Sequence, residues 1–234
     1  MKPDFDIYLI TDRTKTGGRD LKDVIAESLK AGIRGVQLRE KDIPTRGLLS
    51  LAVELREITR KAGAKLLING RIDICLAVEA DGVQIGKDSI PADIARGILG
   101  SDKIIGVSTH SLSEALMAQI QGADFITLGP IYYTESKAQY GAPLGIDMIK
   151  RVRETIEIPV FAIGGIKIDN IRPLLEAGAY GIAMISAIIS ARDIKDTAME
   201  FVSKMKSFKE RTTRATEGEA IIICGGPCGA VAPP

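Results

Sequence analysis

The chain has 234 residues, 45% of them hydrophobic and 26% charged, which is enough to build the core of one α/β barrel or of two small domains. Its formal net charge of +1 argues against a dedicated nucleic-acid-binding protein, and no apolar run is long enough to span a membrane. The polar amino terminus is unlike a signal peptide, and an odd number of cysteines is unlike a disulfide framework, so we expect a cytoplasmic protein.

Eight short apolar runs divide the chain into similar units. Most of them are continuous rather than alternating, which is the pattern of parallel strands that are covered on both faces. The predicted strands are residues 7–10, 35–38, 65–68, 82–85, 104–107, 125–128, 159–163 and 181–185.

The segments between these strands carry apolar residues at helical spacing. Pro91 suits the first turn of one helix, and Ser111 with Glu114 three residues later predicts a capping box at the start of another. The clearest helical patterns cover residues 21–29, 48–58, 72–78, 146–153 and a last amphipathic stretch from about 194 to 208.

Eight strands that alternate with about eight helices predict a (β/α)8 barrel over residues 1–210. A doubly wound open sheet is the alternative, because periodicity does not show whether a sheet closes. Polar residues follow nearly every predicted strand, and only a closed barrel gathers all carboxyl ends of its strands around one mouth. This pattern favours the barrel.

The polar residues at the strand ends predict an anion site. Several cations, hydroxyl groups and glycine-flanked amides are the groups that bind a highly charged phosphate ligand. The loop over residues 129–137 is the richest of these strand exits, and the amides near Gly165 and Ser186 follow the seventh and eighth strands, where barrels often bind phosphate. The predicted mouth contains Arg39, Lys41, Asn69, Lys87, Ser108, Thr134, Ser136 and Lys137.

These motifs, in this order, resemble the thiamine phosphate synthase and thiazole tautomerase family. The similarity covers about residues 7–206, and family members are barrels that act on small-molecule phosphate and diphosphate substrates. The motifs that carry it are YLITDR at 8–13, VQLREKD at 36–42, LIN at 67–69, GVSTHS at 106–111, GPIYYTESK at 129–137, AIGGI at 162–166 and MISAI at 184–188.

The resemblance implies a role for each site residue. In the synthase, a pyrimidine methyl diphosphate loses pyrophosphate and a thiazole phosphate captures the resulting cation, so no nucleophile–base pair is required and the single histidine, His110, is expected to have a supporting role. Arg39, Ser108 and Lys137 are the implied catalytic residues. The diphosphate would be held by Gln37, Arg39, Lys41, Asn69 and Lys137, and the thiazole phosphate by Thr134, Ser136, Gly165, Ile185 and Ser186, with Ser108 beside the reacting centre.

The sequence departs from the synthase pattern where Mg²⁺ is expected. Family synthases usually carry carboxylates at two positions that are Gly70 and Ser89 here, which leaves Asp88 as a weak candidate ligand. Position 84, where family synthases frequently have a histidine, is a glutamine here, and this residue is similar to the metal-independent tautomerase branch. Pro130 and Lys41 do not match that branch. We therefore expect a synthase with a weakened Mg²⁺ site, with a tautomerase or a non-catalytic thiazole phosphate binding protein as alternatives.

The end of the chain differs from the rest. Residues 211–234 are predicted to form a poorly ordered C-terminal extension. Cys224 and Cys228 have the spacing of a metal or disulfide pair, but no second ligand pair lies near them, so we do not expect either. The apolar part of the extension could dock on a neighbour, and a homo-oligomer is one expectation.

Overall fold

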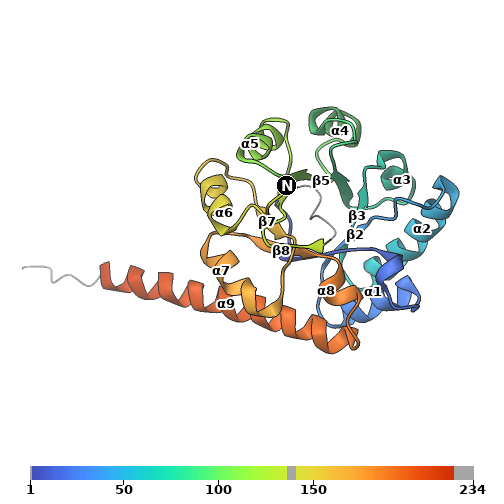
Figure 1. The fold of residues 1–234 in the computed structure, drawn as a ribbon. Helices are drawn as coiled ribbons and strands as arrows, with labels where there is room; N and C mark the ends of the chain where they lie inside the picture. The colour runs from blue at the N-terminus through green and yellow to red at the C-terminus, as the bar shows by residue number, and fades with distance from the viewer. Residues whose placement is uncertain (1, 136–140, 224–234) are drawn as a thin grey trace, which may run out of the picture.

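The structure, a computed structural model, describes residues 2–135 and 141–223, with residues 212–223 as backbone alone. Within these residues, eight parallel strands pair in sequence order and β1 also pairs with β8, so the sheet closes (Figure 1). The predicted barrel is confirmed and the open sheet is excluded. The strands are β1 (Ile7–Ile10), β2 (Gly35–Leu38), β3 (Lys65–Asn69), β4 (Gly82–Ile85), β5 (Ile104–Thr109), β6 (Phe125–Leu128), β7 (Val160–Ile163) and β8 (Gly181–Met184).

Helices surround the barrel in chain order (Figure 1). Ser111 caps the fifth of them by accepting a hydrogen bond from the Glu114 N–H, and the Glu114 carboxylate accepts one from the His110 N–H. No helix in the described part of the chain combines the length and the apolar character that a bilayer-spanning segment needs. The helices are α1 (Leu21–Lys30), α2 (Thr45–Lys61), α3 (Ile72–Ala77), α4 (Ala92–Leu99), α5 (Leu112–Ile120), α6 (Ile146–Arg153), α7 (Ile171–Glu176), α8 (Ser186–Ile189) and α9 (Ile194–Ile223).

The last helix is longer than predicted. α9 packs against α1, α7 and α8, and it continues past Phe208 to Ile223, beyond the body of the barrel (Figure 1). Residues 209–223 contain no proline and several strong helix formers, so the backbone can stay helical beyond Met205, the last of the described residues of α9 that is buried. That residues 211–234 form a poorly ordered extension stays a prediction, and Cys224 and Cys228 lie outside the described residues.

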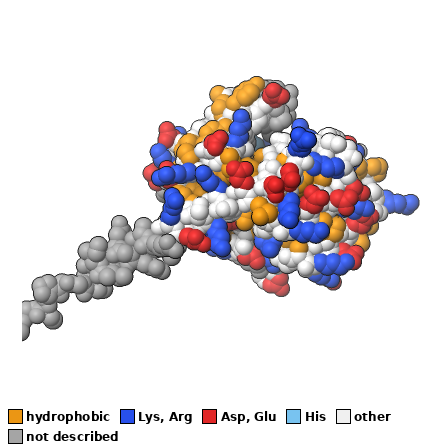
Figure 2. Space-filling model, turned by 90° about the horizontal axis from the view of Figure 1, so that it is seen from below, with side chains coloured by type: hydrophobic (Ala, Val, Ile, Leu, Met, Phe, Trp, Pro, Cys, Tyr) orange, Lys and Arg blue, Asp and Glu red, His pale blue; other side chains and the backbone are white. Residues whose placement is uncertain are grey.

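The outer surface carries charges of both signs. On the face seen in Figure 2, lysine and arginine side chains alternate with aspartate and glutamate rather than forming one basic area. This mixture agrees with the net charge of +1.

The barrel interior has an aromatic layer at the amino ends of the strands. Side chains of a strand alternate between the interior and the helices, and the interior positions hold a cluster that is separate from the outer core. Its rings stack or meet edge to face, with centroid separations such as 5.1 Å for Phe125 and Phe161. This aromatic layer fills the interior near the amino ends of the strands, so we expect a ligand at the opposite mouth. It consists of Phe5, Tyr8, Phe125, Phe161 and Tyr180.

Interior glycines allow close contacts inside the barrel, and Gly82 allows the close approach of the β5 backbone. A methyl group at Gly82 would overlap the backbone carbonyl oxygen of Ile104, which no side-chain rotation relieves. We expect Gly82→Ala to lower the free energy of unfolding by about 2–3 kcal/mol in urea titrations. Gly97→Ala is the matched control, because Gly97 lies in α4 with open space around it, and it should stabilise the protein by about 0.5–1 kcal/mol. Equal effects of the two substitutions would contradict this account.

Candidate active site

Polar side chains form a layer above the aromatic rings, on the mouth side of the barrel. Gln37 and Gln84 are 2% and 1% exposed, so their amide groups are out of solvent contact. The Gln37 Nε2 donates to Asn69 Oδ1 at 2.9 Å, and the Gln84 Nε2 donates to Ser108 Oγ at 3.0 Å and to Thr127 Oγ1 at 3.4 Å. These contacts place the predicted residues Gln37, Asn69 and Ser108 on one polar floor.

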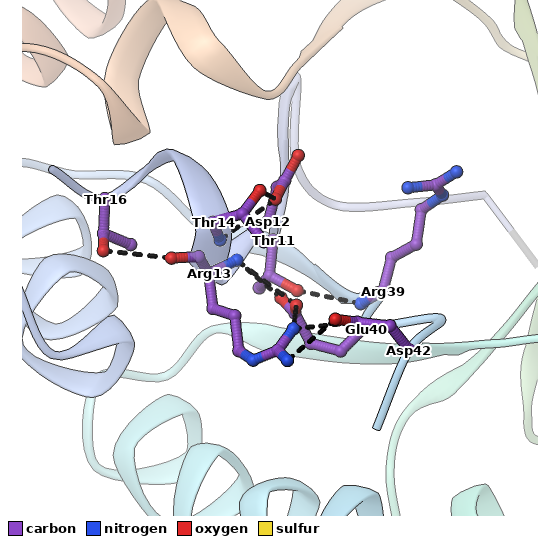
Figure 3. Close-up of polar contacts among 8 residues, drawn as sticks. All are labelled: Thr11, Asp12, Arg13, Thr14, Thr16, Arg39, Glu40 and Asp42. Atoms are coloured by element: carbon purple, nitrogen blue, oxygen red, sulfur yellow. Dashed lines mark hydrogen bonds and ion pairs between the residues drawn. The ribbon is translucent and has the colours of Figure 1, made fainter. Parts of the chain in front are cut away.

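Arg39 follows β2 and is held in place through its backbone. Its N–H donates to the buried Thr11 Oγ1 at 2.9 Å, which ties the exit of β2 to the exit of β1. Within the described residues, the Arg39 guanidinium makes no hydrogen bond or ion pair, and Figure 3 shows the side chain extending away from its charged neighbours. A half-buried cation is therefore available to a ligand. Lys41, two residues on, is exposed.

The charged residues next to Arg39 pair with one another. Arg13 donates from Nη1 and Nη2 to the Asp42 carboxylate at 2.6 and 2.8 Å, and its backbone N–H donates to the buried Glu40 at 3.1 Å (Figure 3). The hydrogen bonds from Arg13 lower the pKa of Asp42 below its ordinary value. Because Arg13 is occupied in this way, Arg39 is the better placed of the two arginines to bind an anionic ligand. Sequence reasoning missed this network.

The loops after β6 and β7 pack together as one unit. Tyr132 N–H donates to the Gly164 carbonyl at 3.1 Å, and Asn170 Nδ2 donates to the Gly165 carbonyl at 3.0 Å. Both glycines have positive φ, 96° and 65°, and a Cβ at Gly165 would lie 2.6 Å from the Tyr132 Cβ. Only glycine fits this close approach, which places Gly165 beside the loop that continues to the partly buried Thr134. Ser136 and Lys137 lie outside the described residues.

The remaining predicted residues lie at neighbouring strand exits. Ile185 follows β8 and packs partly against the interior cluster, and Ser186 begins the short helix α8. Lys87 is exposed after β4. His110 is exposed after β5, where its Nδ1 lies 3.2 Å from Glu114 Oε2. Among the described residues, the barrel topology thus brings the predicted phosphate-binding positions to one mouth, while His110 pairs with Glu114 at the start of α5.

The residues at the β3 and β4 exits do not form a carboxylate site for Mg²⁺. A Cβ at Gly70 would lie 3.0 Å from Ser89 Oγ, so the two positions face each other, but neither carries a carboxylate. Ser89 Oγ already accepts a hydrogen bond from the Gly86 N–H, and Asp88 is exposed. Among the side chains of residues 2–135 and 141–211, no group of three or more histidine, cysteine, aspartate or glutamate residues is placed to hold a metal ion. The described residues therefore do not fit the expected Mg²⁺ ligands.

Comparison with known proteins agrees with the motifs. The sequence profile of the TMP-TENI family, described as thiamine monophosphate synthase, matches residues 7–188. A Geobacter sulfurreducens protein, provisionally named a thiamine-phosphate synthase, is 55% identical over 197 residues, which cover 84% of this chain and 92% of that one. The thiamine-phosphate synthase of Moorella thermoacetica is 40% identical over 213 residues, covering 91% of this chain and 98% of the relative.

A solved structure shows the same similarity in three dimensions. The thiamine phosphate pyrophosphorylase from Pyrococcus furiosus superimposes with a TM-score of 0.79 and 35% sequence identity. The match covers 87% of this chain and 96% of the other.

Proposed function

We propose that this chain, which belongs to the thiamine monophosphate synthase family, joins an aminopyrimidine methyl diphosphate to a thiazole phosphate and releases pyrophosphate. The observation that carries the proposal is the convergence on one mouth of donors that have no acceptor among the described residues. The guanidinium of Arg39, the amide N–H groups of Asn69 and the hydroxyl of Ser108 lie at the mouth-side ends of β2, β3 and β5, above the aromatic layer. The names of the relatives favour this activity over tautomerisation.

The reaction needs stabilisation of a leaving anion rather than a base. The bond between the pyrimidine methylene carbon and the diphosphate oxygen breaks, and its electron pair leaves with pyrophosphate. The thiazole nitrogen then donates its lone pair to the methylene carbon and forms the new C–N bond, so no proton has to be transferred. Negative charge grows on the departing oxygen, and preorganised donors such as Arg39 and Asn69 lower the barrier because they interact more strongly with the transition state than with the substrate.

The second substrate would bind at the neighbouring exits. Thr134, Gly165 and the Ile185–Ser186 turn belong to the loops after β6, β7 and β8, where barrels commonly bind phosphate. In this proposal, these residues and the predicted Ser136 hold the thiazole phosphate, and Lys137 and Lys41 add charge on the diphosphate side. Such an arrangement would present the thiazole nitrogen to the pyrimidine cation across the polar floor.

Incubation with both substrates and Mg²⁺ tests the proposal directly. We expect thiamine phosphate and pyrophosphate to appear in equal amounts, measured by chromatography and by a pyrophosphate release assay. Absence of both products at saturating concentrations would refute the synthase. Isomerisation of the thiazole carboxylate phosphate that is unaffected by a chelator would then identify a tautomerase, and calorimetric binding of thiazole phosphate without turnover would identify a binding protein.

Magnesium enters this proposal only as a partner of the diphosphate. Since Gly70 and Ser89 provide no carboxylate, the ligands of any Mg²⁺ would be mainly diphosphate oxygens and water. We expect calorimetry to detect no Mg²⁺ binding to the protein alone. The double substitution Gly70→Asp with Ser89→Asp should create binding in the micromolar-to-millimolar range, because the two positions face each other. Strong Mg²⁺ binding by the unmodified protein would contradict this expectation.

A cytoplasmic location and a homo-oligomer remain predictions.

A further inference from the structure

Strands β2 and β4 contain the same short pattern. Residues 35–38 read Gly-Val-Gln-Leu and residues 82–85 read Gly-Val-Gln-Ile. In both strands the glycine and the glutamine occupy interior positions, and the valine and the aliphatic residue belong to the outer core. The resemblance to known enzymes assigns Gln37 to the ligand but leaves Gln84 without a role.

The two glutamines have equivalent surroundings. Gln37 pairs in register with Leu67 and donates to Asn69, two residues further along β3 toward the mouth. Gln84 pairs in register with Gly106 and donates to Ser108, two residues further along β5 toward the mouth. The same contact is thus made twice, from one strand to the next, each time from a buried amide to a residue of the polar floor.

The direction of each hydrogen bond determines whether the acceptor residue can still donate a hydrogen bond to a ligand. A hydroxyl oxygen that accepts a hydrogen bond from an amide still has its own hydrogen to donate. Because Gln84 Nε2 donates to Ser108 Oγ, the Ser108 hydrogen is directed elsewhere. The same logic leaves the two N–H groups of Asn69 available after its Oδ1 has accepted from Gln37. Both floor residues can therefore act as donors, as an anionic ligand requires.

We propose that Gln84 is a positioning residue that fixes the Ser108 hydroxyl as a hydrogen-bond donor to the departing diphosphate oxygen. This inference rests on the proposed function and adds a residue to it. Gln84 does not contact the substrate itself, because its side chain is 1% exposed and lies beneath Ser108. Its effect on the reaction passes through the Ser108 hydroxyl.

The orientation of the Gln84 amide follows from its neighbours. With Nε2 toward Ser108 and Thr127, both N–H groups have acceptors, and only Oε1 is buried without a partner among the described residues. The Oε1 lies against Gly106, where a methyl group would overlap it. The reversed amide would instead bury two N–H groups at this apolar position, and unpaired buried donors are costly. The donor role of Gln84 toward Ser108 is thus the arrangement with fewer unpaired groups.

Gln84→Met removes the donor and keeps a side chain of similar length. We expect kcat to fall at least tenfold while the KM for thiazole phosphate changes less than twofold, and we expect the Kd for inorganic pyrophosphate to rise about tenfold in calorimetry. Gln119→Met is the matched control. Gln119 lies in α5, away from the mouth, and its Oε1 accepts from the N–H groups of Glu157 and Ile158 at 2.7 and 3.2 Å. It should lower thermal stability without changing kcat or pyrophosphate affinity.

Gln84→Glu provides a second readout if Gln84→Met does not fold. Burial raises the pKa of a carboxyl group, and the carboxyl group introduced at this position regains a donor for Ser108 when it is protonated. Pyrophosphate affinity of Gln84→Glu, relative to the unmodified protein at the same pH, should therefore recover as the pH falls from 8 toward 6. The proposal would be overturned if the ratio of the pyrophosphate affinities of Gln84→Glu and the unmodified protein did not change with pH. Unchanged kcat and pyrophosphate affinity in Gln84→Met would also overturn it, and so would losses in Gln119→Met as large as those in Gln84→Met. If the unmodified protein shows no turnover, the synthase function fails, and the pyrophosphate measurements alone decide the role of Gln84.

Discussion

Replacing Arg39 with methionine is expected to lower kcat/KM by about 100- to 1,000-fold, because removal of one preorganised electrostatic partner of a developing anion typically has an effect of this size. The guanidinium is half-buried and has no partner among the described residues, so its charge is available to the diphosphate. Thr11 accepts a hydrogen bond from the Arg39 backbone and not from its side chain, so the fold should survive the substitution. Steady-state kinetics with both substrates would measure the loss.

Arg13→Met is the matched control for this prediction. Arg13 comes from the neighbouring strand exit and carries the same charge, but it is paired with Asp42 and Glu40 (Figure 3). Its loss should change kcat/KM less than about fivefold, because its guanidinium is held by Asp42 and is not available to bind the diphosphate. Arg39→Lys should recover only part of the activity, since a lysine does not reproduce the planar fork of donors. A large effect of Arg13→Met together with a small effect of Arg39→Met would contradict the prediction and show that Arg13 provides the ligand-binding charge.

Much of the fold could be predicted from the sequence because each strand and helix of the barrel is marked by a pattern of neighbouring residues. Continuous apolar runs predicted the strands to within one or two residues, and β5 is longer than predicted because Ser108 and Thr109 continue the pairing with Thr127 and Leu128. Closure of the sheet depends on the β1–β8 pairing, which joins residues at opposite ends of the barrel and leaves no periodic signal.

The site was accessible only in part. The motifs identified the strand exits that carry Arg39, Asn69 and Gly165, and the barrel topology brings these exits together. The hydrogen bond from Gln84 to Ser108 and the pairing of Arg13 depend on cross-strand register and on side-chain geometry, so neither leaves a signal in the residue pattern. Gln84 itself could be noticed in the sequence, from its place in the repeated Gly-Val-Gln pattern and from the histidine that is frequent there in the family, but its contact with Ser108 could not.

Phe161→Ala is expected to lower the free energy of unfolding by about 3–5 kcal/mol, the range measured for loss of a buried ring from a core. The Phe161 ring is fully buried and lies 5.1 Å from Phe125, 5.5 Å from Phe5 and 5.5 Å from Tyr180 between centroids. Strand backbones surround this layer, so the cavity cannot collapse easily. A loss of this size would be a large part of the total stability of a single domain.

Urea unfolding followed by circular dichroism would measure the effect, with a lower transition midpoint and an unchanged slope as the expected result. Ile120→Ala is the control, because Ile120 is 67% exposed and should change the stability by less than about 0.5 kcal/mol. Phe161→Leu should give an intermediate loss, since it fills part of the cavity but makes no ring contacts. If Phe161→Ala were as mild as Ile120→Ala, the aromatic layer would not support the barrel, and the polar floor that holds Asn69 and Ser108 would need another source of rigidity.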